Sequence, residues 1–152
     1  MSWKPDITVA AIVERDGRFL LVEESIRGRR VFNQPAGHVE SGESFLAAVI
    51  RETLEETAWH FEPQWLLGVY PWRAPHGSGS TLRFAFIGQA RDHEPQRPLD
   101  TPVIAAHWLS REELLQPARV LRTPLVLRCV DDFLSGRRLP LTAINDPRAT
   151  EP

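Results

Sequence analysis

The chain has 152 residues, a formal net charge of −2 and one cysteine, Cys129. This length predicts a single domain with its own core, and the near-neutral charge argues against a nucleic acid polymer as partner. A lone cysteine excludes a disulfide scaffold, and no apolar stretch approaches the roughly 20 residues that a membrane span needs. We therefore expect a cytoplasmic protein that binds neither nucleic acid polymers nor membranes.

The first part of the chain predicts several strands followed by one amphipathic helix. β-branched residues favour the strands, and Asp16-Gly17 is a typical hairpin turn between the first two. Leu46, Val49 and Ile50 recur at helical spacing further on. The expected elements are a strand at 7–13, a strand at 19–22, a loop at 26–30, a short strand at 31–34, a turn at 35–37 and a helix over 44–58.

The second part predicts further strands and two helices. Ser110 with Glu113 forms a capping-box pattern that opens a short helix, and Gly136 ends a later one. Because the strands do not alternate regularly with helices, we expect an α/β fold of the α+β type, an α/β/α sandwich with a mixed β-sheet between helices. The expected elements are strands at 64–72, 81–88 and 104–109, a loop at 74–80, a helix over 124–134, one domain over 1–141 and a loosely held tail over 142–152.

One face of the helix over 44–58 gathers three carboxylates. Around the helix axis Glu56 lies about 40° and Glu55 about −60° from Glu52, opposite the apolar residues. Like charges at this spacing repel by about 0.2 to 0.5 kcal/mol per pair. A hard divalent cation would reverse the sign, because Mg²⁺ and Mn²⁺ prefer oxygen ligands. Taken alone, the helix leaves a solvated acidic face as an equal alternative.

Neighbouring residues favour the metal site. Arg51 precedes Glu55 by four residues and can pair with it or with Glu43. Pro35-Ala36-Gly37 is a glycine-containing turn before the helix, and such a turn lets backbone carbonyls approach an ion.

At this point the residues resemble a known family. The spacing resembles the Nudix box of the Nudix hydrolases, and it is specific because six residues match over about twenty positions. Thr53 stands where the family usually has an aliphatic residue, and Ala58 stands where it has glycine. Neither departure removes a charge. The matching residues are Gly37, Glu43, Arg51, Glu52, Glu55 and Glu56.

The resemblance implies a fold, a cofactor and roles for these residues. Nudix hydrolases cleave nucleoside diphosphate derivatives with Mg²⁺, or with Mn²⁺ as an alternative, held by the box glutamates. Carried over, Glu52, Glu55 and Glu56 are metal ligands, and Gly37 supplies a carbonyl. Arg51 and Glu43 then form a supporting pair. The catalytic base is left open between Glu52 and a later acidic residue.

Weaker resemblance outside the box points to a phosphatase branch of the family. It implies a small nucleotide or diphosphate substrate, namely a nucleoside di- or triphosphate or a thiamin-precursor pyrimidine diphosphate. Arg73 and Arg83 are candidates for phosphate binding and Trp72 for ring stacking, each against an ordinary structural role. Asp100 is the candidate later base, with a plain loop aspartate as the alternative.

Two functions from different classes stay open. The first is a metal-dependent pyrophosphohydrolase, which the acidic helix after a glycine-containing segment favours. The second is a non-catalytic Nudix-like domain that binds a nucleotide or sugar nucleotide, which Ala58 and Pro102 favour. The sequence does not decide between a monomer and a homodimer.

Overall fold

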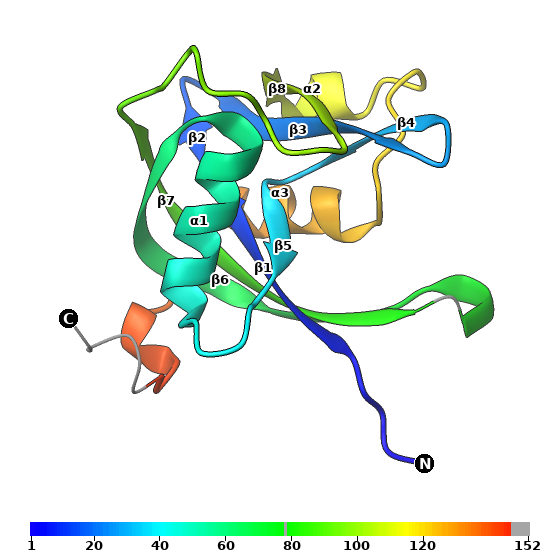
Figure 1. The fold of residues 1–152 in the computed structure, drawn as a ribbon, viewed down its shortest axis with the longest axis vertical. Helices are drawn as coiled ribbons and strands as arrows, with labels where there is room; N and C mark the ends of the chain where they lie inside the picture. Colours follow the sequence, from blue (N-terminus) through cyan, green and yellow to red (C-terminus); the bar gives the residue numbers. More distant parts are fainter. Residues whose placement is uncertain (78, 147–152) are drawn as a thin grey trace.

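The computed structural model describes residues 1–77 and 79–146 and forms a body of strands with helices on its outside (Figure 1). The elements in chain order are β1 (Asp6–Ile12), β2 (Glu14–Arg15), β3 (Arg18–Ile26), β4 (Arg29–Asn33), β5 (Ala36–His38), α1 (Phe45–Thr57), β6 (His60–Arg73), η1 (Pro75–Gly77), β7 (Ser80–Arg91), β8 (Val103–Ser110), α2 (Arg111–Leu114), α3 (Leu125–Leu134) and η2 (Leu141–Ala143).

The strand β1 lies inside a mixed four-stranded sheet of order β5-β1-β7-β6. It runs parallel to β7, with Val9 opposite Phe84, and antiparallel to β5, with Val9 opposite Gly37. The expected hairpin between the first two strands is therefore wrong. The Asp16-Gly17 turn joins β3 to the two-residue strand β2 instead, since β1 ends at Ile12.

The strand β3 organises the second sheet. It pairs antiparallel with β2, β4 and β8. The loop expected at 26–30 is also wrong, because β3 continues to Ile26 and β4 begins at Arg29. Arg27 and Gly28 have φ angles of 50° and 75°, as the two central residues of a tight hairpin turn require. The turn expected at 35–37 is likewise a strand over its last two residues, because β5 pairs with β1.

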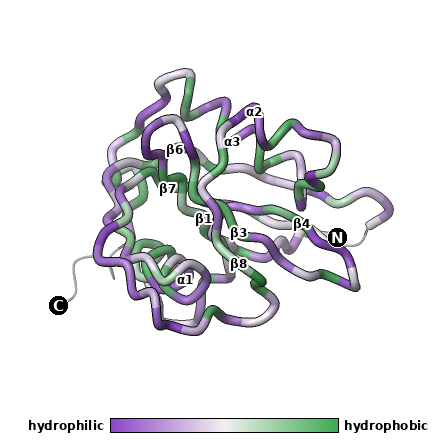
Figure 2. Tube along the Cα trace, turned by 90° about the horizontal axis from the view of Figure 1, so that it is seen from above, coloured by the Kyte–Doolittle hydropathy of each residue, from purple (hydrophilic) through white to green (hydrophobic). Residues whose placement is uncertain are grey.

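Both sheets lie between helices, with α1 on one side and α2 and α3 on the other (Figure 2). The apolar strands β1 and β3 run through the middle, where Val9 and Leu21 are fully buried. The expected mixed arrangement of strands between helices is confirmed, divided over two sheets. No described helix is both long enough and apolar enough to cross a membrane.

Short-range signals place the helix ends. The Ser44 side chain accepts a hydrogen bond from the backbone N–H of Ala47 and so caps α1. The expected capping box at the start of α2 is confirmed, with Ser110 and Glu113 each capping the other's backbone. Thr53 is fully buried, as its position on the apolar face of α1 predicts.

The end of α1 carries backbone strain. Ala58 has a φ of 62°, a left-handed conformation, and its N–H donates to the carbonyl of Leu54. A Cβ in this conformation costs about 1 kcal/mol, which is why glycine is common at such caps.

We expect Ala58→Gly to raise the free energy of unfolding by about 0.5 to 1 kcal/mol, measured by urea unfolding. Ala47→Gly, at an exposed position in the same helix, is the matched control and should lower it by a similar amount. A loss of stability in Ala58→Gly would show that the left-handed cap is not strained.

The last described residues lie against the body of the protein. Ile144 packs beside the core, and the backbone N–H of Phe45 donates to Asp146 Oδ2 at 3.2 Å. Residues 147–152 of the expected tail lie outside the described residues, and a domain boundary at residue 141 stays a prediction.

Candidate functional site

The acidic face of α1 lies against β5, so it is not a solvent-exposed face. The backbone N–H of Ala36 donates to Glu56 Oε1 at 2.8 Å, and the Glu56 residue is 8% exposed. The position opposite the apolar stripe is therefore buried. Glu52 and Glu55 are partly buried beside it, with side chains 15% and 28% exposed.

Arg51 connects most of the charged residues that the sequence singles out. Its Nε donates to Glu43 Oε2 at 2.7 Å, and its Nη2 donates to Glu43 Oε1 at 3.0 Å. Its Nη1 lies 2.9 Å from Glu52 Oε1 and 3.1 Å from Glu55 Oε2. Nη2 also donates to the carbonyl of His38. One guanidinium thus holds α1 to the segment that precedes it, and the expected pairs with Glu43 and Glu55 are both present.

Gly37 allows Glu52 to lie directly against β5. A Cβ added to Gly37 would fall 2.1 Å from Cδ and 2.3 Å from Oε1 of Glu52. Any larger residue would therefore displace this carboxylate. Glycine at this position lets the Glu52 side chain approach the backbone closely, and the same residue also pairs in strand β5.

The carboxylates are buried close together, and this changes their pKa values. Burial raises the pKa of Glu56 to about 8, the N–H of Ala36 opposes that change, and the nearby charges of Glu24 and Glu52 add to it. Burial also raises the pKa of Glu52 above its usual range. The hydrogen bonds from Arg51 lower the pKa of Glu43. Without a cation, burial therefore favours the protonated, uncharged form of Glu56 near neutral pH.

A cavity of about 140 Å³ opens beside Gly37. Trp72 lies in its wall with Arg83 and Arg122. Arg83 is 6% exposed, and it donates to Gln34 Oε1 at 2.8 Å and to Asn33 Oδ1 at 2.9 Å. These bonds hold the guanidinium rigidly in the cavity lining.

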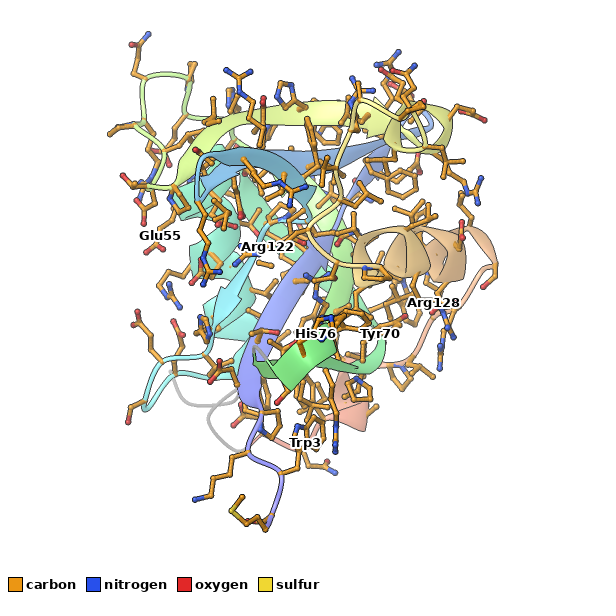
Figure 3. The ribbon with its side chains drawn as sticks, turned by 90° about the vertical axis from the view of Figure 1, so that its right-hand side faces the viewer. Trp3, Glu55, Tyr70, His76, Arg122 and Arg128 are labelled. Atoms are coloured by element: carbon orange, nitrogen blue, oxygen red, sulfur yellow. The ribbon has the colours of Figure 1, made fainter. Side chains whose placement is uncertain are left out.

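The structure gathers some of the expected substrate residues and separates others. Trp72 and Arg83 line the cavity, as Gly37 does. Arg73 does not, because its guanidinium lies 4.7 Å over the ring of Trp3, at the opposite end of the molecule from Glu55 (Figure 3). Asp100 is also outside the lining, as Glu52, Glu55 and Glu56 are, and its N–H donates to the carbonyl of Glu55.

The sequence did not indicate two further candidate functional residues, Glu24 and Arg122. Glu24 Oε2 accepts a hydrogen bond from Arg122 Nη1 at 2.6 Å, and the Glu24 side chain is only 2% exposed. Burial raises the pKa of Glu24, and Arg122 opposes that change. No local pattern connects two residues 98 positions apart.

The donor set fits a hard divalent cation in its chemistry. Glu52 and Glu56 present oxygen ligands at the Ala36-Gly37 backbone, and their pKa values are raised chiefly by burial, with nearby carboxylates adding to the change. Within residues 1–77 and 79–146, however, no three acidic, histidine or cysteine side chains already converge as a metal-binding group. Arg51 binds both Glu52 and Glu55 instead.

Comparisons with known proteins agree on one family. A family model described as NUDIX domain matches residues 4–128. Phosphatase NudJ from Escherichia coli (strain K12) is 40% identical over 144 residues, which cover 95% of this chain and 93% of that protein. A solved NUDIX hydrolase from Nitrosomonas europaea has a TM-score of 0.91 and 43% identity, over 97% of this chain and 100% of that chain.

A more distant structure shares the fold alone. It is the NUDIX domain of Shewanella oneidensis NrtR complexed with ADP ribose, with a TM-score of 0.68 and 17% identity. The likeness covers 88% of this chain and 90% of that one.

Proposed function

Because this chain belongs to the Nudix family and is an enzyme of the Nudix hydrolase type, we propose that it hydrolyses a pyrophosphate bond with the help of a divalent cation. The substrate is a nucleoside di- or triphosphate or a related small diphosphate, such as the pyrimidine precursor of thiamin. The observation that carries this proposal is the meeting of the buried carboxylate of Glu56 and the partly buried carboxylate of Glu52 at the Ala36-Gly37 segment, beside a cavity lined by two arginines.

We place the cation at the oxygen donors around the Ala36-Gly37 segment. Glu52, Glu55, Glu56 and the carbonyl of Gly37 would hold Mg²⁺, with Mn²⁺ as an alternative. When bound, the cation would neutralise the negative charge of the pyrophosphate oxygens and lower the pKa of an attacking water.

The remaining residues bind, orient and position. Arg51 and Glu43 fix the end of β5 against α1, so the distance between Gly37 and Glu52 is maintained. The buried Arg83 presents positive charge to the cavity without moving, since two amide oxygens hold it. Trp72 offers an apolar wall on which a base or pyrimidine ring can pack.

The proton acceptor is one of two residues. Neither Glu52 nor Asp100 lines the cavity, but Glu52 lies against Gly37, which does, whereas the N–H of Asp100 donates to the carbonyl of Glu55. We propose Glu52 as the base on this ground. The alternative assignment predicts that Asp100→Asn reduces turnover as much as Glu52→Gln does.

A nucleotide panel tests the function. The purified protein with Mg²⁺ is given nucleoside di- and triphosphates, ADP-ribose and pyrimidine diphosphates, and the release of phosphate and of pyrophosphate is measured separately. We expect release from at least one nucleoside di- or triphosphate and none with excess chelator. Tight binding without any release would favour the non-catalytic binding domain.

The near-neutral charge and the lone buried thiol of Cys129 support a cytoplasmic location.

A further inference from the structure

A second cavity, of about 600 Å³, lies beside the first one. It is formed by the β3–β4 hairpin and by the segment 120–122, and Arg122 lines both cavities. The segment is fastened to β4, because the N–H of Phe32 donates to the carbonyl of Val120 and the N–H of Arg122 donates to the carbonyl of Phe32, both at 2.8 Å. The two cavities therefore share Arg122, and the segment that carries it is fixed to β4. Figure 3 shows Arg122 near the middle of the side of the molecule that faces the viewer.

Side chains alternate between the two faces of β4, so one of its arginines faces the second cavity and the other faces away from it. Side chains of a strand point to opposite faces in turn, so Arg29 and Val31 share one face and Arg30 lies on the other. Arg29 and Val31 accordingly line the cavity. Arg30 lies outside the lining and is 3.6 Å from Glu23. The hairpin turn adds Arg27 to the cavity.

The charges of the second cavity are not balanced. Arg122 has a carboxylate partner in Glu24, which is buried behind it. Arg27 and Arg29 are exposed, and neither forms an ion pair with any acidic side chain in the parts of the chain that the structure describes. Two exposed guanidiniums without acidic partners, in one cavity with Arg122, which also lines the cavity beside Gly37, favour an anion with several oxygens. Arginine matches phosphate because its planar donors can bind two oxygens at once.

We propose that Arg27, Arg29 and Arg122 form a second anion subsite, which binds a phosphate of the substrate beyond the pyrophosphate that lies at Gly37. The inference rests on the proposed function. It assigns to the enzyme a preference for longer phosphate chains, so that nucleoside triphosphates and tetraphosphates bind more tightly than diphosphates. The apolar side chains of Val31 and Leu121 in the same wall limit the water around the bound phosphate and strengthen its pairing with arginine.

The double variant Arg27→Gln/Arg29→Gln tests this subsite without disturbing the buried partner of Arg122. We expect the KM for adenosine triphosphate to rise about tenfold, with kcat within twofold and the KM for adenosine diphosphate within twofold. The control is Arg30→Gln, which removes one positive charge from the other face of the hairpin and should behave as the unchanged protein. An unaltered ratio of the two KM values in the double variant, or an equal effect of Arg30→Gln, would overturn the proposal.

A binding measurement separates this inference from the proposed function. Inorganic tripolyphosphate is titrated calorimetrically into each protein without divalent cations, and we expect the double variant to bind about tenfold more weakly than Arg30→Gln. If the unchanged protein cleaves no nucleotide, the proposed function fails, and equal tripolyphosphate binding in the two variants would then also overturn the subsite. Weaker tripolyphosphate binding with an unaltered KM ratio in an active enzyme would show a site for a separate anion and contradict the proposal.

Discussion

Replacing Glu56 with glutamine is expected to lower turnover about a thousandfold while the fold is preserved. The amide oxygen of glutamine can still accept the hydrogen bond from Ala36, so the contact between α1 and β5 remains. What is lost is the negative charge of a proposed cation ligand, and such electrostatic stabilisation accounts for several kcal/mol of the barrier. Steady-state kinetics with Mg²⁺ measure the effect. Glu62→Gln, at an exposed position on β6, is the control and should retain full activity.

The same variant is expected to change the dependence of stability on pH. The pKa of Glu56 is about 8 in the folded protein, above the ordinary value of 4.5 that applies in the unfolded chain. Between these pH values the folded state holds an additional proton, so the free energy of unfolding falls as pH rises towards 8. Glu24 and Glu52 act in the same direction, because burial raises the pKa of each. This applies to the protein without divalent cations.

Urea unfolding with chelator at pH 5.5 and pH 8 measures this effect. The unchanged protein should lose on the order of 3 kcal/mol between the two conditions, and Glu56→Gln should lose clearly less. Added Mg²⁺ should restore stability to the unchanged protein at pH 8 more than to the variant, since a ligand that binds only the folded state stabilises it. Equal pH slopes for the two proteins would contradict the burial of an ionisable Glu56.

Gly37→Ala is expected to remove most activity at little cost in stability. The added Cβ would fall 2.1 Å from Cδ of Glu52, so the carboxylate must move away from β5. Gly37 lies in a paired strand whose conformation alanine adopts readily, and the flexible side chain of Glu52 can turn aside at the cost of its hydrogen bond with Arg51. We expect turnover to fall about a hundredfold and the free energy of unfolding to change by less than about 1 kcal/mol.

A double-variant cycle provides the control for this second prediction. If alanine acts by displacing Glu52, then Gly37→Ala should add little to the loss already caused by Glu52→Gln. Full additivity of the two losses would show that the glycine acts in another way. Normal turnover in Gly37→Ala would show that the position of Glu52 against β5 is unimportant.

The residues of the acidic helix could be predicted from the sequence because their spacing is local. A helix turns about 100° per residue, so Glu52, Glu55 and Glu56 lie together whatever surrounds them. The same regularity predicts the pairing of Arg51 with Glu55, which the structure confirms. The family resemblance built on this spacing is confirmed as well.

The burial of these residues depends on elements distant in the chain. The sequence places Glu56 on the face opposite the apolar residues, but β5 covers that face and encloses the carboxylate. An amphipathic pattern shows which residues share a face, and it does not show whether another strand lies against that face. The buried character of Glu56, and with it the raised pKa, could not be predicted from the helix alone.

The sequence by itself therefore determined the family, the mixed arrangement of strands and helices, and the acidic helix, since these follow from periodicity and fixed spacing. Only the tertiary structure decided that β1 pairs with β7, that Arg83 lines the cavity while Arg73 lies on Trp3, and that Arg122 meets Glu24. The physical reason is that strand periodicity defines the two faces of a strand but not its neighbour. Contacts between residues 98 positions apart form only when the whole chain packs.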